Sequence, residues 1–293
     1  MRAARRKQLG IGLLWISPWI IGFSVFLLLP MAMSFYYSFT DYPLLGVPVF
    51  VGADNYARLV QDEVFWVSIK NTALFTIVLV PLMTTASVLT AVLLNSAIAW
   101  RTVHRAAIFL PQLVPLVATC MIWQWLFNPG SGLINRALGW VGIEGPSWLQ
   151  DTTWAMPGIG IMTLWVIGQP VVIYLAALQD VPRSLYEAAD LDGVGPIGRF
   201  FNVTLPMISP VVLFNVIMTL LGMLQIFVQP YIMTGGGPGE ATLFYAQYLY
   251  QQAFEFRDMG YACAMAWVQV VIIVGLTGLI FLAARRLVHY QGS

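Results

Sequence analysis

Charged residues are scarce in this chain of 293 residues. Asp, Glu, Lys and Arg make up 9% of it, whereas a soluble domain carries about 25%. Hydrophobic residues make up 59%, and the formal net charge of +1 leaves no basic surface for nucleic acid. The composition therefore excludes a disordered chain or a nucleic-acid-binding domain. It predicts a polytopic membrane protein that is surrounded by a lipid bilayer.

Cysteine and histidine are also scarce, with two of each. Cys120 and Cys263 lie in apolar runs, at a spacing that suits neither a metal site nor a CxxC redox pair. We expect both to pack as small side chains between helices. His104 and His289 stand near arginines at the ends of apolar runs. With so few candidate ligands, we expect no protein-bound metal.

Long apolar runs, in contrast, are abundant. A helix needs about 20 apolar residues to cross a hydrocarbon core of about 30 Å, and in lipid it must satisfy its own backbone hydrogen bonds. Six runs reach that length without a single Asp, Glu, Lys or Arg: Ile11–Pro30, Asn71–Leu94, Ala106–Phe127, Trp154–Leu178, Met207–Val228 and Tyr261–Ala284. We therefore expect an all-α fold with six transmembrane helices.

The basic residues between these runs predict the orientation of the chain. If the N-terminus is cytoplasmic, ten of them lie inside: Arg2, Arg5, Arg6, Lys7, Arg101, Arg105, Arg183, Arg199, Arg285 and Arg286. The other four lie outside: Arg58, Lys70, Arg136 and Arg257. This excess predicts that both termini are cytoplasmic. The first run is too long for a signal peptide and lacks a cleavage site, so we expect it to be retained.

Three segments lie outside in this topology. Asp41–Lys70 is predicted to hold a short helix near Asn55–Trp66, and Asn128–Thr153 is a loop rich in Gly and Trp. The third, Gln229–Gly260, contains a Gly-Gly-Gly-Pro sequence at 235–238 and then an aromatic segment. Because no linker or low-complexity tract divides the chain, residues 1–293 are predicted to form a single transmembrane domain.

The predicted spans contain no Asp, Glu, Lys, Arg or His side chain. A proton-coupled transporter usually keeps an acid or histidine relay inside the membrane, and an intramembrane hydrolase needs catalytic acids, histidines or an activated nucleophile. No GxxxxGK[ST] phosphate-binding loop occurs either. We therefore expect that the chain is not an enzyme. If it moves a solute uphill with ATP, a separate polypeptide must hydrolyse that ATP.

Uncharged polar residues do occur within the predicted spans: Gln124, Gln169, Asn215, Thr219, Gln225 and Gln269. Such residues usually form hydrogen bonds between membrane helices. They would equally suit a path for a neutral, hydroxyl-rich solute such as a sugar, since each can donate and accept. Gln225 and Gln229 are four residues apart and are predicted to share a helix face. Both interpretations remain open at this point.

The cytoplasmic loop between the fourth and fifth spans, residues 179–206, carries the most distinctive pattern. Pro182 suits the first turn of a helix, and the residues of Arg183–Leu191 are good helix formers. Gly193 is predicted to end that helix. A second short helix is expected over Arg199–Thr204.

The composition of this predicted helix favours a protein partner over lipid. A helix on the membrane surface presents several Lys or Arg residues, whereas this one is predominantly acidic. Ala188 and Ala189 would let another backbone approach closely. We therefore expect the helix to bind a protein groove.

The residues of this loop resemble a known motif. Glu187-Ala188-Ala189, then Gly193, then Val203-Thr204-Leu205-Pro206 resemble the EAA loop of binding-protein-dependent ABC importer permeases, in which Ile is favoured where Val203 stands. Further segments are similar to the carbohydrate-uptake permeases: Ser38–Tyr42, Gly52–Tyr56, Lys70–Thr72, Phe109–Pro111, Trp123–Pro129, Thr234–Pro238 and Gly260–Ala262. They resemble the half of the maltose and glycerol-3-phosphate systems that carries the Gly-Gly-Pro loop. Members commonly have Asp where this chain has Val228.

The resemblance implies a type I ABC importer permease fold with a core over residues 68–285, in the cytoplasmic membrane of a prokaryote. It implies four partners: a second, paralogous permease, two ATP-binding subunits and an extracytoplasmic solute-binding protein. ATP and magnesium would bind the ATPase subunits, and this chain would bind no cofactor. The residues implied in ATPase coupling are Tyr186, Glu187, Ala188, Ala189, Asp192, Gly193, Leu205 and Pro206.

The resemblance also implies solute contacts in the spans that flank the loop. The matching positions are Gln169, Thr219, Gly222, Met223, Gln225 and Ile226, and the residue pattern adds Gln229. Pro170 would kink the span beside Gln169, and Gly222 would let a sugar ring approach the backbone. Met223 and Ile226 would supply an apolar ring face. Because no span carries Arg or Lys, a neutral sugar or polyol is favoured over a phosphorylated solute.

Two alternative functions stay open from the sequence. An ion-coupled secondary transporter can build a Na⁺ site from unwound backbone carbonyls, without charged side chains. A membrane scaffold that transports nothing is the second alternative. Genomic neighbours or copurified subunits would distinguish them from an ABC permease.

Overall fold

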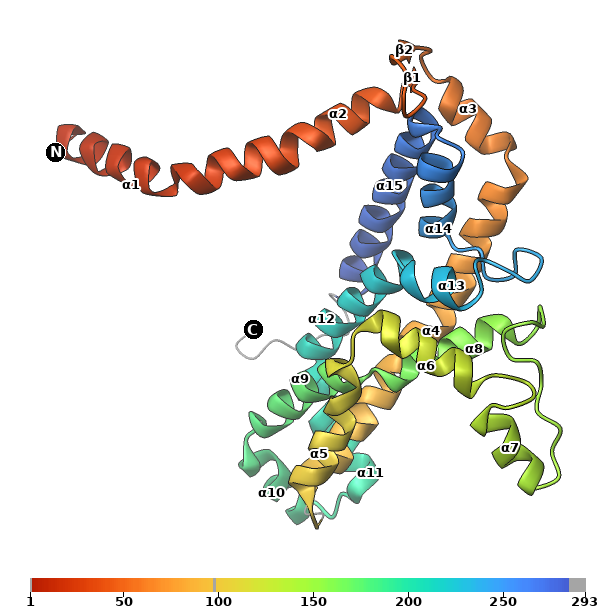
Figure 1. Ribbon diagram of the computed structural model, residues 1–293. Helices are drawn as coiled ribbons and strands as arrows, with labels where there is room; N and C mark the ends of the chain where they lie inside the picture. Colours follow the sequence, from red (N-terminus) through yellow and green to blue (C-terminus); the bar gives the residue numbers. More distant parts are fainter. Residues whose placement is uncertain (1, 97–98, 285–293) are drawn as a thin grey trace. The chain divides into compact units, whose positions relative to one another are not determined.

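The computed structural model describes residues 2–96 and 99–284, which are mostly helical (Figure 1). The chain divides into two compact units. The first comprises residues 1–62 and 249–271, and the second comprises residues 63–248 and 272–293. Three residues named above lie outside the described residues: Arg285, which is also the end of the expected core, Arg286 and His289.

The first unit contains a long N-terminal helix and a small sheet. Its elements are α1 (Arg2–Phe23), a π-helical stretch (Ser24–Leu28), α2 (Leu29–Tyr37), β1 (Thr40–Asp41), β2 (Val49–Phe50), α3 (Asp54–Gln61), a second π-helical stretch (Gln251–Glu255) and the part of α15 (Met259–Ala284) up to residue 271. The strands pair antiparallel, with Thr40 opposite Phe50.

The sheet is held by buried polar contacts. The Asn55 side-chain amide donates to the carbonyls of Ser38 (3.0 Å) and Thr40 (2.9 Å). A Cβ on Gly260 would stand only 2.0 Å from the Thr40 carbonyl oxygen, so the start of α15 can reach the sheet only with glycine there. Arg58 stacks over the Tyr261 ring at 4.1 Å from its centroid.

The second unit contains most of the apolar core. Its elements are α4 (Glu63–Asn95), α5 (Arg101–Phe109), a 3₁₀ turn (Leu110–Leu113), α6 (Leu116–Leu126), α7 (Leu133–Trp140), α8 (Ala155–Trp165), α9 (Gly168–Gln179), α10 (Arg183–Leu191), α11 (Pro196–Arg199), a π-helical stretch (Phe200–Thr204), α12 (Leu205–Leu224), α13 (Val228–Met233), most of α14 (Tyr245–Tyr250) and the end of α15.

Two clusters of buried side chains hold this unit together. One is centred on Phe75, Trp123 and Phe244 and joins α4, α6, α8, α12 and α13. The other is centred on Tyr174 and Ile208 and joins α4, α9 and α12. The helix α4 contributes to both clusters and is therefore the central element of the unit.

Four helical segments are long and apolar enough to cross a membrane: Ile11–Tyr37, Glu63–Asn95, Pro196–Met233 and Met259–Ala284. Two further pairs reach that length only as bent helices, α5 with α6 (101°) and α8 with α9 (46°) (Figure 1). The described residues therefore contain four candidate spans, or six if each bent pair counts as one.

Proline is the physical reason why the third and fourth predicted spans are bent, and in the fourth span a kink beside Gln169 was expected from Pro170. Val114 is extended, as the residue before a proline prefers, so the helix stops before Pro115. The second break falls at Val166 and Ile167. In a continuous helix the ring of Pro170 would clash with the carbonyl of Val166, four residues earlier.

The short helix expected near Asn55–Trp66 is in fact two helices. Asp62 is extended (φ −81°, ψ 108°) and separates α3 from α4. Its carboxylate accepts a hydrogen bond from the Tyr261 hydroxyl. The long helix α4 therefore starts within the segment that was expected to be an outer loop.

Candidate functional site

The helix α10 has the predicted bounds, Arg183–Leu191, and its end is built by glycine. Gly193 adopts φ +71°, a left-handed conformation that costs glycine least. The amide of Gly193 donates to the Asp190 carbonyl (3.1 Å) and that of Val194 to the Ala189 carbonyl (2.9 Å). These two bonds form a Schellman motif, so Gly193 ends the helix as predicted. Pro182 immediately precedes the helix instead of lying in its first turn.

The inner face of α10 is attached to the rest of the second unit. Ala189 is buried, and the Tyr186 hydroxyl lies 3.1 Å from that of Thr204 at the start of α12. The Arg199 guanidinium donates to the Asp190 carboxylate at 2.6 Å, and both side chains are partly open to solvent. The helix is therefore held at two points, one at Thr204 immediately before α12 and one on α11.

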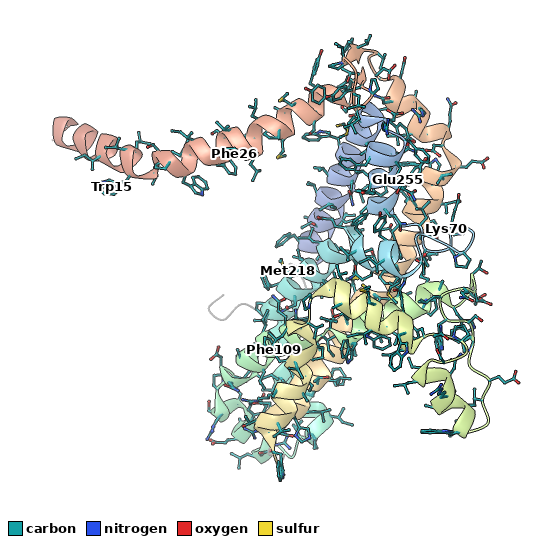
Figure 2. All side chains as sticks on the ribbon, in the orientation of Figure 1. Trp15, Phe26, Lys70, Phe109, Met218 and Glu255 are labelled. Carbon is teal, nitrogen blue, oxygen red and sulfur yellow. The ribbon has the colours of Figure 1, made fainter. Side chains whose placement is uncertain are left out.

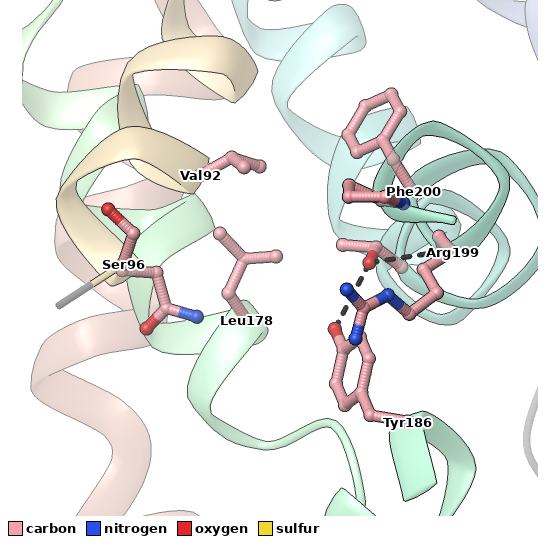
Figure 3. Close-up of a pocket in the computed structure, with 9 residues that line it drawn as sticks. Val92, Ser96, Leu178, Tyr186, Arg199 and Phe200 are labelled. Atoms are coloured by element: carbon pink, nitrogen blue, oxygen red, sulfur yellow. Dashed lines mark hydrogen bonds between the residues drawn. The ribbon is translucent and has the colours of Figure 1, made fainter. Parts of the chain in front are cut away.

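A pocket of about 410 Å³ lies beside this attachment. Figure 3 shows Tyr186, Arg199 and Phe200 on one side of it and Val92, Ser96 and Leu178 on the other. The pocket therefore lies between the ends of α4 and α9 on one side and α10, α11 and the π-helical stretch on the other.

The outer face of α10 is open and mixes apolar side chains with carboxylates. Glu187, Ala188 and Asp192 are exposed, as their expected role requires. Leu191 is 90% exposed and Ile197 on α11 is 77% exposed. We call these five residues the α10 surface.

The sequence reasoning missed Leu191 and Ile197. The signal that could have found them is two large apolar residues in a predicted surface loop beside acidic ones. Leu205 and Pro206 are not part of the α10 surface, since they form the first turn of α12 and are half-buried.

The residues expected along a solute path lie near two helix breaks. Gln169 is exposed in the first turn of α9, where its backbone amide has no partner within the helix. Its partner is Gln112, whose side-chain oxygen accepts a hydrogen bond from the backbone amide of Gln169 at 2.9 Å. Its nitrogen donates to the Gln169 side-chain oxygen at 3.2 Å. The pair joins the two bent helices, so Gln169 does serve to pack helices.

The other path residues differ in their exposure. Gly222 and Gln225 are exposed, and Thr219 and Gln229 are half-buried. Met223 and Ile226 instead pack inside the cluster centred on Phe75, and are 8% and 3% exposed. A Cβ on Gly222 would meet nothing within 4 Å. The polar and glycine positions are thus the accessible members of the set within this chain.

The prediction that Gln225 and Gln229 share a helix face was wrong. The helix α12 ends at Leu224, and α13 begins at Val228. A continuous helix would bring the ring of Pro230 against the carbonyl of Ile226. The two glutamines therefore lie on either side of a break.

The Gly-Gly-Gly-Pro loop is fastened to α4. The Asn71 side-chain amide donates to the carbonyls of Glu240 (2.8 Å) and Leu243 (3.1 Å). The hydroxyl of Thr72 accepts the amide of Tyr245 at 2.9 Å. Burial raises the pKa of the Tyr245 phenol above its ordinary value. The hydrogen bonds of Asn71 and Thr72 therefore order this loop within the second unit.

Two other polar features serve helix packing. The Gln124 side-chain nitrogen donates to the carbonyls of Ile232 (2.8 Å) and Met233 (3.3 Å), at the end of α13. Cys120 is buried and Cys263 half-buried, and both are free thiols.

Within residues 2–96 and 99–284 no group of three or more His, Cys, Asp or Glu side chains could hold a metal ion.

Comparisons with known proteins extend over nearly the whole chain. Residues 83–289 match the family described as "Binding-protein-dependent transport system inner membrane component". The probable ABC transporter permease protein YesP of Bacillus subtilis (strain 168) is 37% identical, over 100% of this chain and 96% of the relative. The lactose transport system permease protein LacF of Rhizobium radiobacter is 39% identical, over 94% of each chain.

A solved structure is similar in fold. It is a bacterial alginate ABC transporter in complex with an alginate pentasaccharide-bound periplasmic protein. One of its chains superposes on 97% of this chain with a TM-score of 0.83, at 22% identity, and 96% of that chain is covered. The fold is therefore that of an ABC transporter subunit.

Proposed function

The chain belongs to the family of binding-protein-dependent transport system inner membrane components, and on that premise we propose that it is a permease subunit of an ATP-driven importer for a sugar or related polyol. It forms the translocation path together with a second, paralogous permease. The observation that carries the proposal is α10, a short helix held firmly on its inner face and open on its outer face.

The proposed topology has six spans, with each bent helix pair counted as one. Both termini are cytoplasmic, and the chain is a multi-pass protein of a prokaryotic cytoplasmic membrane. Residues 1–293 act as a single permease domain, with a core over 68–285 and a coupling loop over 179–206. The ten-to-four distribution of basic residues supports this orientation.

In the proposed mechanism the α10 surface lies in a groove of an ATP-binding subunit. Glu187, Ala188, Asp192 and the two exposed apolar residues contact that groove, and Tyr186 with Ala189 connects α10 to the rest of the chain. Gly193 sets the shape of the turn, and Leu205 with Pro206 carries displacement into α12. Closure of the two ATPases can change the permease only through contacts that differ between its states. This chain binds no cofactor, since ATP and magnesium bind the ATPases.

The remaining proposed partners are the second permease and an extracytoplasmic solute-binding protein. The segment Ile11–Tyr37 supports a neighbouring membrane subunit, because none of its most apolar window is buried within the chain. The solute named for one relative, lactose, is a saccharide. The exposed, uncharged Gln169, Gly222 and Gln225 support a saccharide as solute here, with Thr219 and Gln229 less accessible.

The coupling role is tested by copurification. The double variant Glu187→Arg with Leu191→Asp reverses the charge at residue 187 and replaces the apolar side chain at residue 191 of the α10 surface with a carboxylate. We expect the tagged chain to retain the second permease and to lose the ATP-binding subunit. Trp140→Asp is the matched control, since Trp140 on α7 is 87% exposed and Leu191 is 90% exposed. Retention of the ATPase by the double variant would show that α10 is not the coupling element.

The solute path is tested by Gln225→Leu and Gln169→Leu in vesicles that contain the complete complex. We expect slower saccharide uptake with unchanged basal ATP hydrolysis, because each loses a hydroxyl-binding amide. Gln112→Leu is the control for Gln169, since it removes the same interhelical hydrogen bonds and leaves residue 169 intact. If Gln112→Leu slows uptake as much as Gln169→Leu, the role of Gln169 is packing alone.

A further inference from the structure

An apolar groove of about 460 Å³ lies between α4 and α8, away from the α10 surface and the proposed path. All of its lining residues are apolar or glycine. Leu74, Val78 and Leu82 form one wall, and Ile161 belongs to the other. At the bottom Gly160 has no side chain, and a Cβ there would stand 3.3 Å from a methyl carbon of Leu79. The two helices therefore approach each other closely at the bottom of the groove through a glycine.

The wall on α4 continues a stripe of residues spaced four apart. Trp66, Lys70, Leu74, Val78 and Leu82 are neighbours along one winding face of this helix. Lys70, labelled in Figure 2, is exposed, and among the described residues no carboxylate forms an ion pair with it. Trp66 is 51% exposed, and tryptophan is typical of the membrane–water interface. Along α4, the stripe thus runs from the indole ring of Trp66, past the Lys70 ammonium, to the apolar groove.

The dimensions of the stripe match one leaflet of a bilayer. Lys70 and Leu82 are twelve residues apart, which is about 18 Å along a helix. Half of the hydrocarbon core is about 15 Å thick. A helix of a second permease would continue across both leaflets, whereas a single acyl chain ends within one. The length of the stripe, and the cation one helical turn before the groove, therefore both favour a lipid.

We propose that this groove binds one anionic phospholipid, with an acyl chain between α4 and α8 and its phosphate beside the Lys70 ammonium. The acyl chain fills a concavity lined by apolar side chains, and the ammonium pairs with the phosphate of the headgroup. The proposal depends only on the chain spanning a membrane, and does not depend on the solute or on the ATPase contacts.

The test measures lipid retained by the complete complex, purified in mild detergent, using native mass spectrometry with added phosphatidylglycerol or phosphatidylcholine. We expect the wild type to retain phosphatidylglycerol preferentially, and Lys70→Glu to reduce that retention at least about fivefold. Lys70→Arg should restore it. Arg136→Glu, which reverses an exposed cation away from the groove, should leave it unchanged.

The groove itself is tested by Ile161→Trp, which we expect to reduce retention of both lipids. Leu93→Trp is the matched control, because Leu93 is an exposed residue of α4 outside the groove. Equal retention by Lys70→Glu and the wild type would overturn the proposal. Loss of the second permease from Ile161→Trp, with lipid retained, would also overturn it and would identify the groove as a subunit contact.

Discussion

Replacement of Gly193 by serine tests whether the shape of the turn after α10 matters for function. Gly193 has φ +71°, and a Cβ at this position would meet no atom within 4 Å. The penalty is therefore conformational and not steric. A residue with a side chain in the left-handed region costs about 1–2 kcal/mol. Because the turn is exposed, we expect that cost to favour local opening of the turn and not global unfolding.

A cost of that size changes a local equilibrium by a factor of about 5 to 30. The assay is hydrogen exchange at the amides of residues 193 and 194, which donate the two bonds of the Schellman motif. Both amides should exchange faster by about that factor, and solute-stimulated ATP hydrolysis by the complex should fall. Gly193→Asn should recover most of both, since asparagine tolerates this conformation.

Gly195→Ser is the matched control, two residues further along. A Cβ on Gly195 would also meet nothing within 4 Å, but its φ is −67°, and serine is preferred at the residue that precedes a helix such as α11. We expect unchanged exchange at residues 193 and 194 in this variant. If both serine variants behave alike, the left-handed conformation is not what the turn requires, and our account of Gly193 is wrong.

Two further predictions concern hydrogen bonds outside the α10 surface. Asn71→Ala removes the side-chain donor to the carbonyls of Glu240 and Leu243, although the Glu240 carbonyl keeps the backbone amide of Leu243, and should lower the free energy of unfolding by about 1–3 kcal/mol and expose the loop to protease. An unchanged melting temperature and cleavage rate would contradict this. Tyr261→Phe removes the hydroxyl that donates to the Asp62 carboxylate, and should cost about 1.5–3 kcal/mol in thermal unfolding in detergent. Unfolding at the wild-type temperature would show that this bond adds nothing.

The family, the six apolar segments and the bounds of α10 could all be predicted from the sequence. These features depend on local properties of the chain. A run of about 20 apolar residues is helical in lipid whatever its neighbours are, because its backbone has no other hydrogen-bond partners. Gly193 likewise acts within a single turn, so its position and type were enough to predict the end of the helix.

The helix breaks depended on tertiary structure. Pro81 and Pro210 lie inside helices that continue past them, whereas the chain breaks near Pro115 and Pro230. A proline only removes one donor and clashes with one carbonyl. Whether the helix tolerates this depends on which neighbours satisfy the freed backbone groups. Gln124 likewise satisfies the last carbonyls of α13 from another helix, and no local pattern identifies it.

Exposure also depended on tertiary structure. The sequence alone determined that this protein crosses a membrane in helices and carries an acidic helix between two of them. Only the packed chain decided that Met223 and Ile226 are buried while Gln225 is accessible, and that Leu191 is open beside Glu187. The reason is that chemical type and helix spacing are properties of the chain itself. The face that a helix buries is chosen by contacts with residues far away in the sequence.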